Sequence, residues 1–250
     1  MKKRFFAFGC SYTNWHAHYT WADLVAANFE EYYNFGQGGA CNTYIMNVFL
    51  EANETYKFNS ETDLVMVAFS GFERVSHLEK DNTESYHWRT WGTPDKVDHQ
   101  KSLVWSAYNS WVSVKTIKTI LTDKNIDHKL FMAIDNSPYL YDSHPLELET
   151  RLVNPNGFDA YIPNKIKDLF NQMDCGISID EHRYILEKQK GYEVDIMLHP
   201  NLNVHYDYLK QYFPEYITDK TNEKLKIPNS SLWTCSNGVW GYHYESQLRK

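Results

Sequence analysis

The first seventy residues alternate short apolar segments with amphipathic ones, and this pattern limits the fold more than any other feature. Residues 4–8, 31–35 and 64–69 are apolar or aromatic runs of strand length. Between them, apolar residues recur at helical spacing after Thr20 and after Asn42, and both are residue types that begin helices. A strand, helix, strand, helix, strand order predicts an α/β fold in which helices cover a parallel sheet.

The following part of the chain continues this pattern less regularly. Apolar residues at helical spacing predict a long helix over 103–121, and an apolar run at 129–134 predicts a fourth strand. A further helix is expected after Pro200 and should end before Pro214. Residues 76–100 are polar and are expected to form a loop.

These elements are expected to form one domain with additions. The domain should span residues 1–213 and carry a helical and loop insertion near 136–190, with helical stretches at 164–173 and 180–190. Residues 214–250 have no clear period and are expected to be a C-terminal extension.

Charge and composition exclude several classes of partner. The chain has 25 basic and 32 acidic side chains and a formal charge of -7, so we expect neither nucleic acid nor a membrane as a partner. No apolar run is long enough for a membrane span, and Gly9 ends the N-terminal run too early for a signal peptide, which predicts a cytoplasmic protein. The cysteines have no metal-site or redox spacing and are expected to be free thiols: Cys10, Cys41, Cys175 and Cys235.

Polar residues suited to acyl transfer follow the expected strands. Ser11 follows the first strand, a glycine-rich turn at 36–39 follows the second, and Ser70 follows the third. Asp195 and His199 occur together near the C-terminus. Because ligands bind outside the carboxyl ends of parallel strands, this set indicates a serine acyl hydrolase.

The same residues resemble the sequence blocks of the SGNH (GDSL-like) hydrolases. Residues 8–13 are similar to the nucleophile block, residues 34–42 to the glycine block, and residues 195–200 approximately to the Asp–His block. The resemblance implies an SGNH hydrolase fold, which is a flavodoxin-like three-layer sandwich with a central five-stranded parallel sheet. We expect no cofactor and no metal.

The resemblance also implies a role for each residue. Ser11 would be the nucleophile, His199 the general base and Asp195 the residue that orients the imidazole. The oxyanion hole would be formed by the backbone amides of Ser11 and Gly39, with Ser70 as a third donor.

Two departures from the family pattern affect these roles. Asp195 and His199 are four residues apart instead of three, and Ser70 stands where the family has an asparagine. Asn42 is a candidate to reach into the site in its place and to bind substrate. Arg74 is a candidate to bind an anionic substrate group, although a structural ion pair explains it equally well.

The predicted function is therefore hydrolysis of a short acyl ester, with an O-acetyl group on a carbohydrate as the candidate substrate. Residues 86–91 suit either a sugar-binding platform or a packed loop. The alternatives are a degenerate, non-catalytic relative that binds a glycan or a protein, and a structural protein of a larger assembly.

Three histidines outside the expected triad are also considered as candidates for a function. His16 and His18 could form a metal pair, but no third ligand at suitable spacing is visible, so we interpret them as loop histidines near the mouth of the site. His205 is expected on the helix that follows His199, as a structural or surface residue.

Overall fold

A computed structural model describes residues 2–15, 18–72, 74, 77–80, 86–89, 99–134, 172–190 and 199–226. Its centre is a parallel sheet of four strands in the order β2-β1-β3-β6. The bounds of these strands are β1 (Arg4–Gly9), β2 (Glu31–Gly36), β3 (Asp63–Phe69) and β6 (Asp127–Met132). The predicted α/β class is therefore confirmed; a fifth parallel strand is not present among the described residues.

The two middle strands form the centre of the core. Every residue of β3 is buried, and so is every residue of β1 after Arg4. This agrees with the nearly continuous apolar sequence of both strands, which is typical of strands covered on both faces. The edge strand β2 is less buried and carries tyrosines along its length.

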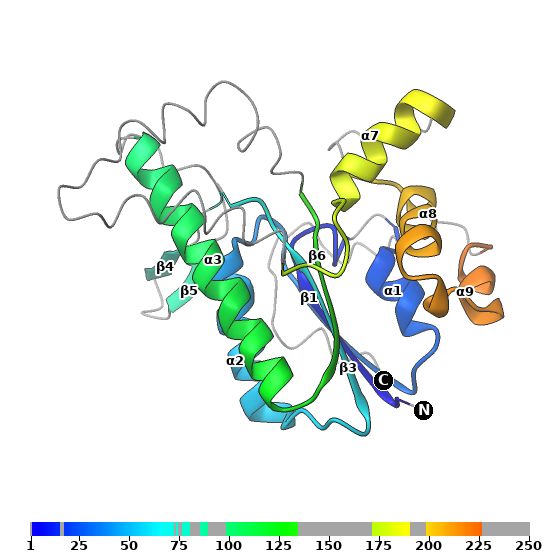
Figure 1. The fold of residues 1–250 in the computed structure, drawn as a ribbon, viewed down its shortest axis with the longest axis horizontal. Helices are drawn as coiled ribbons and strands as arrows, with labels where there is room; N and C mark the ends of the chain where they lie inside the picture. Colours follow the sequence, from blue (N-terminus) through cyan, green and yellow to red (C-terminus); the bar gives the residue numbers. More distant parts are fainter. Residues whose placement is uncertain are drawn as a thin grey trace.

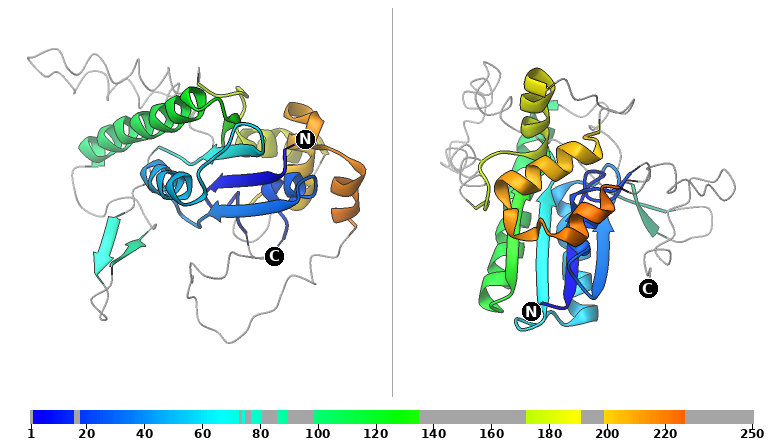
Figure 2. Two further views of the ribbon diagram at one scale, coloured as in Figure 1. Left: turned by 90° about the horizontal axis from the view of Figure 1, so that it is seen from below. Right: turned by 90° about the vertical axis from the view of Figure 1, so that its right-hand side faces the viewer.

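Helices cover both faces of the sheet, and Figures 1 and 2 show the resulting three layers. One face carries α2 (Asn42–Tyr56) and α3 (His99–Asp123), and the other carries α1 (Trp21–Ala26) and α8 (Leu202–Tyr212). A further helix, α7 (Ile179–Lys190), contacts α8. The long helix expected at 103–121 and the helix expected after Pro200 are confirmed.

Alternate aromatic residues of β1 explain how the layers pack. Phe5 meets Trp21 of α1 edge to face, with ring centroids 6.3 Å apart. Phe8 meets Phe49 of α2 in the same way at 5.5 Å, on the other side of the sheet. Because successive side chains of a strand point to opposite faces, β1 supplies aromatic surface to both helix layers.

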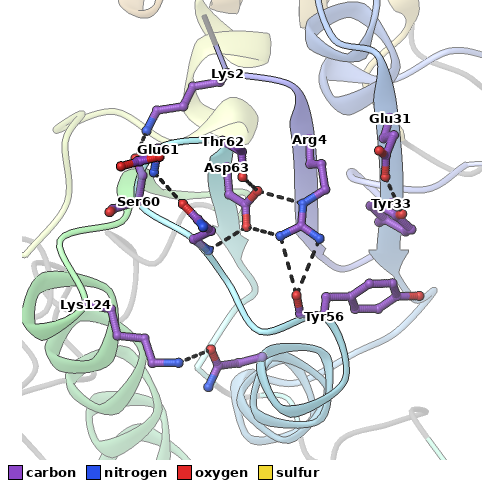
Figure 3. Close-up of polar contacts among 12 residues, drawn as sticks. Lys2, Arg4, Glu31, Tyr33, Tyr56, Ser60, Glu61, Thr62, Asp63 and Lys124 are labelled. Carbon is purple, nitrogen blue, oxygen red and sulfur yellow. Dashed lines mark hydrogen bonds and ion pairs between the residues drawn. The ribbon is translucent and has the colours of Figure 1, made fainter.

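An ion pair joins the two middle strands at their amino ends (Figure 3). Nε and Nη2 of Arg4 each donate to a carboxylate oxygen of Asp63 at 2.7 Å, and the Asp63 side chain is fully buried. The same carboxylate accepts the backbone N–H of Asn59 at 2.8 Å. The hydroxyl of Thr62 also donates to it at 2.7 Å, so the Asp63 carboxylate is fully hydrogen-bonded and holds the amino ends of β1 and β3 together.

Two segments differ from the sequence prediction. Within the expected loop at 76–100, β4 (His77–Lys80) and β5 (Tyr86–Arg89) form a separate antiparallel two-stranded sheet. This pair was missed because four-residue polar strands give no periodic signal. The helical stretch expected at 180–190 is confirmed as α7, whereas that at 164–173 lies almost wholly outside the described residues.

Residues that follow the expected domain boundary at 213 pack on the domain. η2 (Pro214–Tyr216) and α9 (Asp219–Lys224) follow α8 directly, and α9 lies beside α1. Asn28 Nδ2 donates to the backbone oxygen of Tyr216 at 2.9 Å, and the hydroxyl of Thr218 donates to Asn28 Oδ1. Thr221 is fully buried against α1. Residues 214–226 are thus part of the same packed unit.

Two further observations concern the expected class of protein. None of the helices in the described part of the chain is long and apolar enough to cross a membrane. Cys10 and Cys175 are free and buried, as expected, and Cys41 is also buried, while Cys235 lies outside the described residues.

Candidate active site

Ser11 lies in a tight turn that begins where β1 ends. The backbone N–H groups of Thr13 and Asn14 both donate to the backbone oxygen of Cys10, at 3.0 and 3.3 Å. The next helix, α1, begins only at Trp21. Ser11 is therefore not at a helix start, and any stabilisation of an anion here comes from the amides of the turn and not from a helix dipole.

Polar contacts with the neighbouring strand hold this turn, which comprises residues 10–14 and is called the Ser11 turn below. The backbone oxygen of Thr13 accepts Asn34 Nδ2 at 3.0 Å and the hydroxyl of Thr20 at 2.7 Å. Asn14 Nδ2 donates to the backbone oxygen of Gly36 at 3.1 Å. Asn34 also accepts the N–H of Gly36 at 2.9 Å, so it joins the end of β2 to the Ser11 turn.

Two glycines make room for the Ser11 turn against the sheet. A Cβ atom on Gly9 would lie 2.0 Å from Thr13 Oγ1, and one on Gly36 would lie 2.7 Å from Asn14 Cβ and 2.8 Å from Asn14 N. Both distances are far below a van der Waals contact. Glycine is therefore required at these positions so that the Ser11 turn can pack closely on β1 and β2.

We expect Gly36→Ala to displace the Ser11 turn. The new methyl group meets the backbone of Asn14, so the turn must move, which should cost about 1–3 kcal/mol of unfolding free energy. Urea unfolding measures this cost. Gly176→Ala is the matched control, because a Cβ atom there meets nothing within 4 Å. Equal stability of the two variants would contradict the packing described here.

The structure brings Ser11 and His199 into direct contact, although they are 188 residues apart. Nε2 of His199 lies 2.8 Å from Oγ of Ser11, and Ser11 is only 5% exposed. His199 stands just before α8, whose first turn is capped by Asn201 Oδ1 accepting the N–H of Val204 at 3.1 Å. With Nε2 directed at the hydroxyl, a carboxylate that orients the ring would bind at Nδ1. Asp195, the expected carboxylate, lies outside the described residues.

Two aromatic side chains of the first loop contact His199, and neither contact was expected from the sequence. The Trp15 ring stacks on the imidazole with centroids 3.7 Å apart and planes 11° apart. The Tyr12 ring meets it edge to face at 5.4 Å. A sequence offers no signal for these contacts, because they join residues from opposite ends of the chain.

Tyr12 also connects the Ser11 turn to α7. Its hydroxyl donates to Asp180 Oδ1 at 3.1 Å, and the same carboxylate pairs with Arg183 at 2.8 Å. Burial, reinforced by the Asp180 charge, raises the pKa of Tyr12 well above its ordinary value. The phenol therefore stays protonated and remains a donor to Asp180 throughout the range in which proteins are folded.

Ser70 and Gly39 follow the carboxyl ends of β3 and β2, as Ser11 follows the carboxyl end of β1. Gly9 of β1 is in register with Ala68 of β3 and with Gly36 of β2. Ser11 and Ser70 therefore each follow a paired position by two residues. Gly39 has a φ of 73° and lies in the turn after β2. Among the described residues the Ser70 hydroxyl is fully buried and has no hydrogen-bond partner.

Asn42 has a different position from the one expected. Its Oδ1 accepts the N–H of Ser70 at 2.8 Å, and its Nδ2 donates to the Ser70 backbone oxygen and to Ser110 Oγ, both at 3.0 Å. Asn42 is 1% exposed, and both of its amide hydrogens are used. It holds the Ser70 backbone and has no donor left for an oxyanion or a substrate. The helix cap that was expected from Asn42 is provided by Cys41.

Arg74 follows β3 four residues after Ser70 and is half-buried. Its Nη1 is buried and has no hydrogen-bond partner within the part of the chain that the structure describes. The structural ion pair considered from the sequence is not found among those residues, and an anionic substrate group stays a prediction for this side chain.

His18 and His205 are buried neighbours, and His205 is near enough to His199 to interact with it electrostatically. Their ring centroids are 6.1 Å apart, and His205 lies on α8 with 1% of its surface exposed. His18 is 6% exposed, so it is not at the mouth of the site as expected. No cluster of three possible metal ligands exists within the described segments, and His16 lies outside them.

We expect His205 to make folding stability depend on pH. Burial, and then the nearby His18 and His199, hold the pKa of His205 well below its ordinary value. The unfolded chain therefore binds one more proton than the folded chain below pH ~6.5, and stability should fall there by up to about 1.4 kcal/mol per pH unit. Urea unfolding between pH 5 and 8 should show a shallower decline for His205→Gln than for the wild type. Identical pH slopes would contradict this assignment.

Comparison with known proteins does not assign this chain to a family. No protein-family model matches the sequence, and no curated protein is significantly similar to it. A functional assignment therefore depends on the residues themselves and on their geometry.

Proposed function

We propose that this protein is an SGNH-type serine hydrolase that removes a short acyl group from an alcohol. The observation that carries the proposal is the 2.8 Å contact between Ser11 Oγ and His199 Nε2. A buried serine hydroxyl in contact with a histidine ring nitrogen is the minimal arrangement of an activated nucleophile. It is found at the carboxyl edge of a parallel sheet, where α/β proteins bind ligands.

In this proposal, His199 transfers the proton in both halves of the reaction. Ser11 Oγ attacks the ester carbonyl carbon while His199 Nε2 accepts the hydroxyl proton. His199 then gives this proton to the alkoxide as the carbon–oxygen bond breaks, leaving an acyl group on Ser11. In the second half, His199 Nε2 accepts a proton from a water molecule as the water attacks the acyl carbon. His199 then returns this proton to Ser11 Oγ as the acyl carbon–oxygen bond breaks, which releases the acid.

The oxyanion of each tetrahedral intermediate needs donors at the same edge. The amides of Ser11 and Gly39 are the proposed backbone donors, and Ser70 Oγ is the proposed third donor. The buried hydroxyl of Ser70, unpartnered among the described residues, supports this role, because a buried polar group without a partner is costly unless a ligand or water satisfies it. Asn42 contributes by holding the Ser70 backbone.

The sheet topology is compatible with this family of hydrolases. The order β2-β1-β3-β6 corresponds to the first four strands of the flavodoxin-like order 2-1-3-4-5. We therefore propose the SGNH variant of the α/β class. The candidate substrate is an acetyl ester of a carbohydrate, since Trp15 provides partly exposed aromatic surface beside His199.

One observation favours a second candidate, which is a non-catalytic module that binds a glycan or a protein. The side-chain amide that would complete the oxyanion hole is absent at position 70, and the amide of Asn42 is already occupied. Removal of one oxyanion-hole donor from a serine protease lowers kcat by about 10²–10³-fold.

Hydrolysis of p-nitrophenyl acetate, butyrate and octanoate separates the two candidates. The hydrolase should cleave the acetate with the highest kcat/KM, and kcat/KM should rise with pH to a plateau as the imidazole loses its proton. Absence of hydrolysis of all three esters by the folded protein would favour the binding module. Preference for the octanoate would overturn the short-acyl specificity.

A further inference from the structure

We propose that Trp15 is a positioning residue for His199 that holds the imidazole plane and stabilises its protonated form during acyl transfer. The inference rests on the proposed function, because it assigns Trp15 a part in the same reaction. It is carried by one contact, the face-to-face stacking of the two rings at 3.7 Å and 11°.

The geometry restrains the imidazole from three directions. Trp15 covers one face of the ring, the Tyr12 ring meets it edge to face at 5.4 Å, and Ser11 Oγ lies at Nε2. A histidine that lies in a loop before a helix would otherwise rotate about its side-chain bonds. The stacked indole therefore keeps Nε2 directed at the Ser11 hydroxyl.

The same contact has an electrostatic consequence. The face of an indole ring carries negative quadrupole potential and attracts a cation placed over it, by about 0.5–2 kcal/mol. The imidazole is neutral before the reaction and becomes a cation when it takes the Ser11 proton. Trp15 thus stabilises the transition state more than the resting state, which is the condition for raising kcat.

The described titratable groups near His199 do not supply this stabilisation. His205 of α8 is near enough to interact electrostatically with both His199 and His18, and a positive charge on His205 would oppose an imidazolium at position 199. Tyr12 stays protonated and directs its hydroxyl at Asp180 of α7, whose charge is paired with Arg183. Among the described groups, the indole face of Trp15 is placed in direct ring contact where it favours the cation. The expected carboxylate of Asp195 would add to this effect.

Substitution of Trp15 tests both parts of the inference. For Trp15→Leu we expect plateau kcat for p-nitrophenyl acetate, a substrate without a sugar ring, to fall about 3- to 30-fold with KM nearly unchanged. We also expect the pH at half-maximal kcat/KM to move down by about half a unit or more, because the protonated imidazole loses its partner. Trp15→Phe keeps an aromatic face and should recover most of both effects. Tyr56→Leu, at the opposite end of the sheet (Figure 3), is a matched half-buried aromatic control that should change neither.

An NMR titration gives a readout that does not need activity. The midpoint of the His199 ring-proton titration, assigned with His199→Gln, should be lower in Trp15→Leu than in the wild type and intermediate in Trp15→Phe. An unchanged midpoint, or one raised by greater exposure to water, would overturn the inference even in a folded and active variant. If the protein hydrolyses no ester but the midpoint moves down as expected, the proposed function fails while the stacking effect stands.

Discussion

Replacement of Ser11 by alanine is expected to lower kcat for ester hydrolysis by about 10⁴-fold or more, because the variant lacks the atom that forms the acyl-enzyme. The change removes one oxygen whose contact is His199 Nε2, and the Ser11 turn is held by other residues, so the fold should be preserved. Steady-state hydrolysis of p-nitrophenyl acetate measures the loss, and circular dichroism checks the fold.

Ser113→Ala is the control for this experiment. Ser113 is also a fully buried serine, but its hydroxyl donates to the backbone oxygen of Asn109 within α3 at 2.7 Å. Its loss should leave kcat and KM close to the wild-type values. Hydrolysis that persists in Ser11→Ala would show that the activity belongs to another residue.

Asp195→Asn is expected to have the second-largest effect, with kcat lower by roughly 10²–10⁴ and KM nearly unchanged. An asparagine cannot balance the imidazolium charge, and it favours the wrong tautomer of the imidazole. The reason for choosing Asp195 is its place in the sequence just before His199, together with a ring whose Nε2 already faces Ser11.

Glu193→Gln provides the matched control for Asp195, since it removes a neighbouring acidic charge two residues earlier. It should retain kcat within a small factor. If Asp195→Asn keeps the wild-type kcat, then Ser11 and His199 act as a dyad, or a carboxylate elsewhere in the chain orients the ring.

The sequence predicted those parts of the fold that depend on local patterns. Each of these elements has a signal within its own sequence. The signals are the apolar runs of β1 and β3, the helical spacing in α3 and the proline that follows α8. The α/β class follows from their order. The contact of Ser11 with His199 was expected from the types of residue that follow the strands and from the resemblance to a family, since no local pattern joins residues 188 positions apart.

Details that depend on packing could not be predicted. Asn42 was expected to reach into the site, but its amide is buried and donates to Ser70 and Ser110. Asn42 was also expected to cap α2, whereas Cys41 is the capping residue. The packing of residues 214–226 on α1 through Asn28 gives no periodic signal either. Trp15 is the clearest case, because its partner ring lies near the other end of the chain.

The most direct test of the central claim is reaction with a fluorophosphonate, which forms a stable adduct only with an activated serine. Mass spectrometry of the digested protein should find a single adduct, on the peptide that contains Ser11, and His199→Gln should slow its formation at least tenfold, since general-base assistance contributes about 10²–10⁴-fold. Absence of labelling in the folded wild-type protein, or labelling of a serine other than Ser11, would contradict the account.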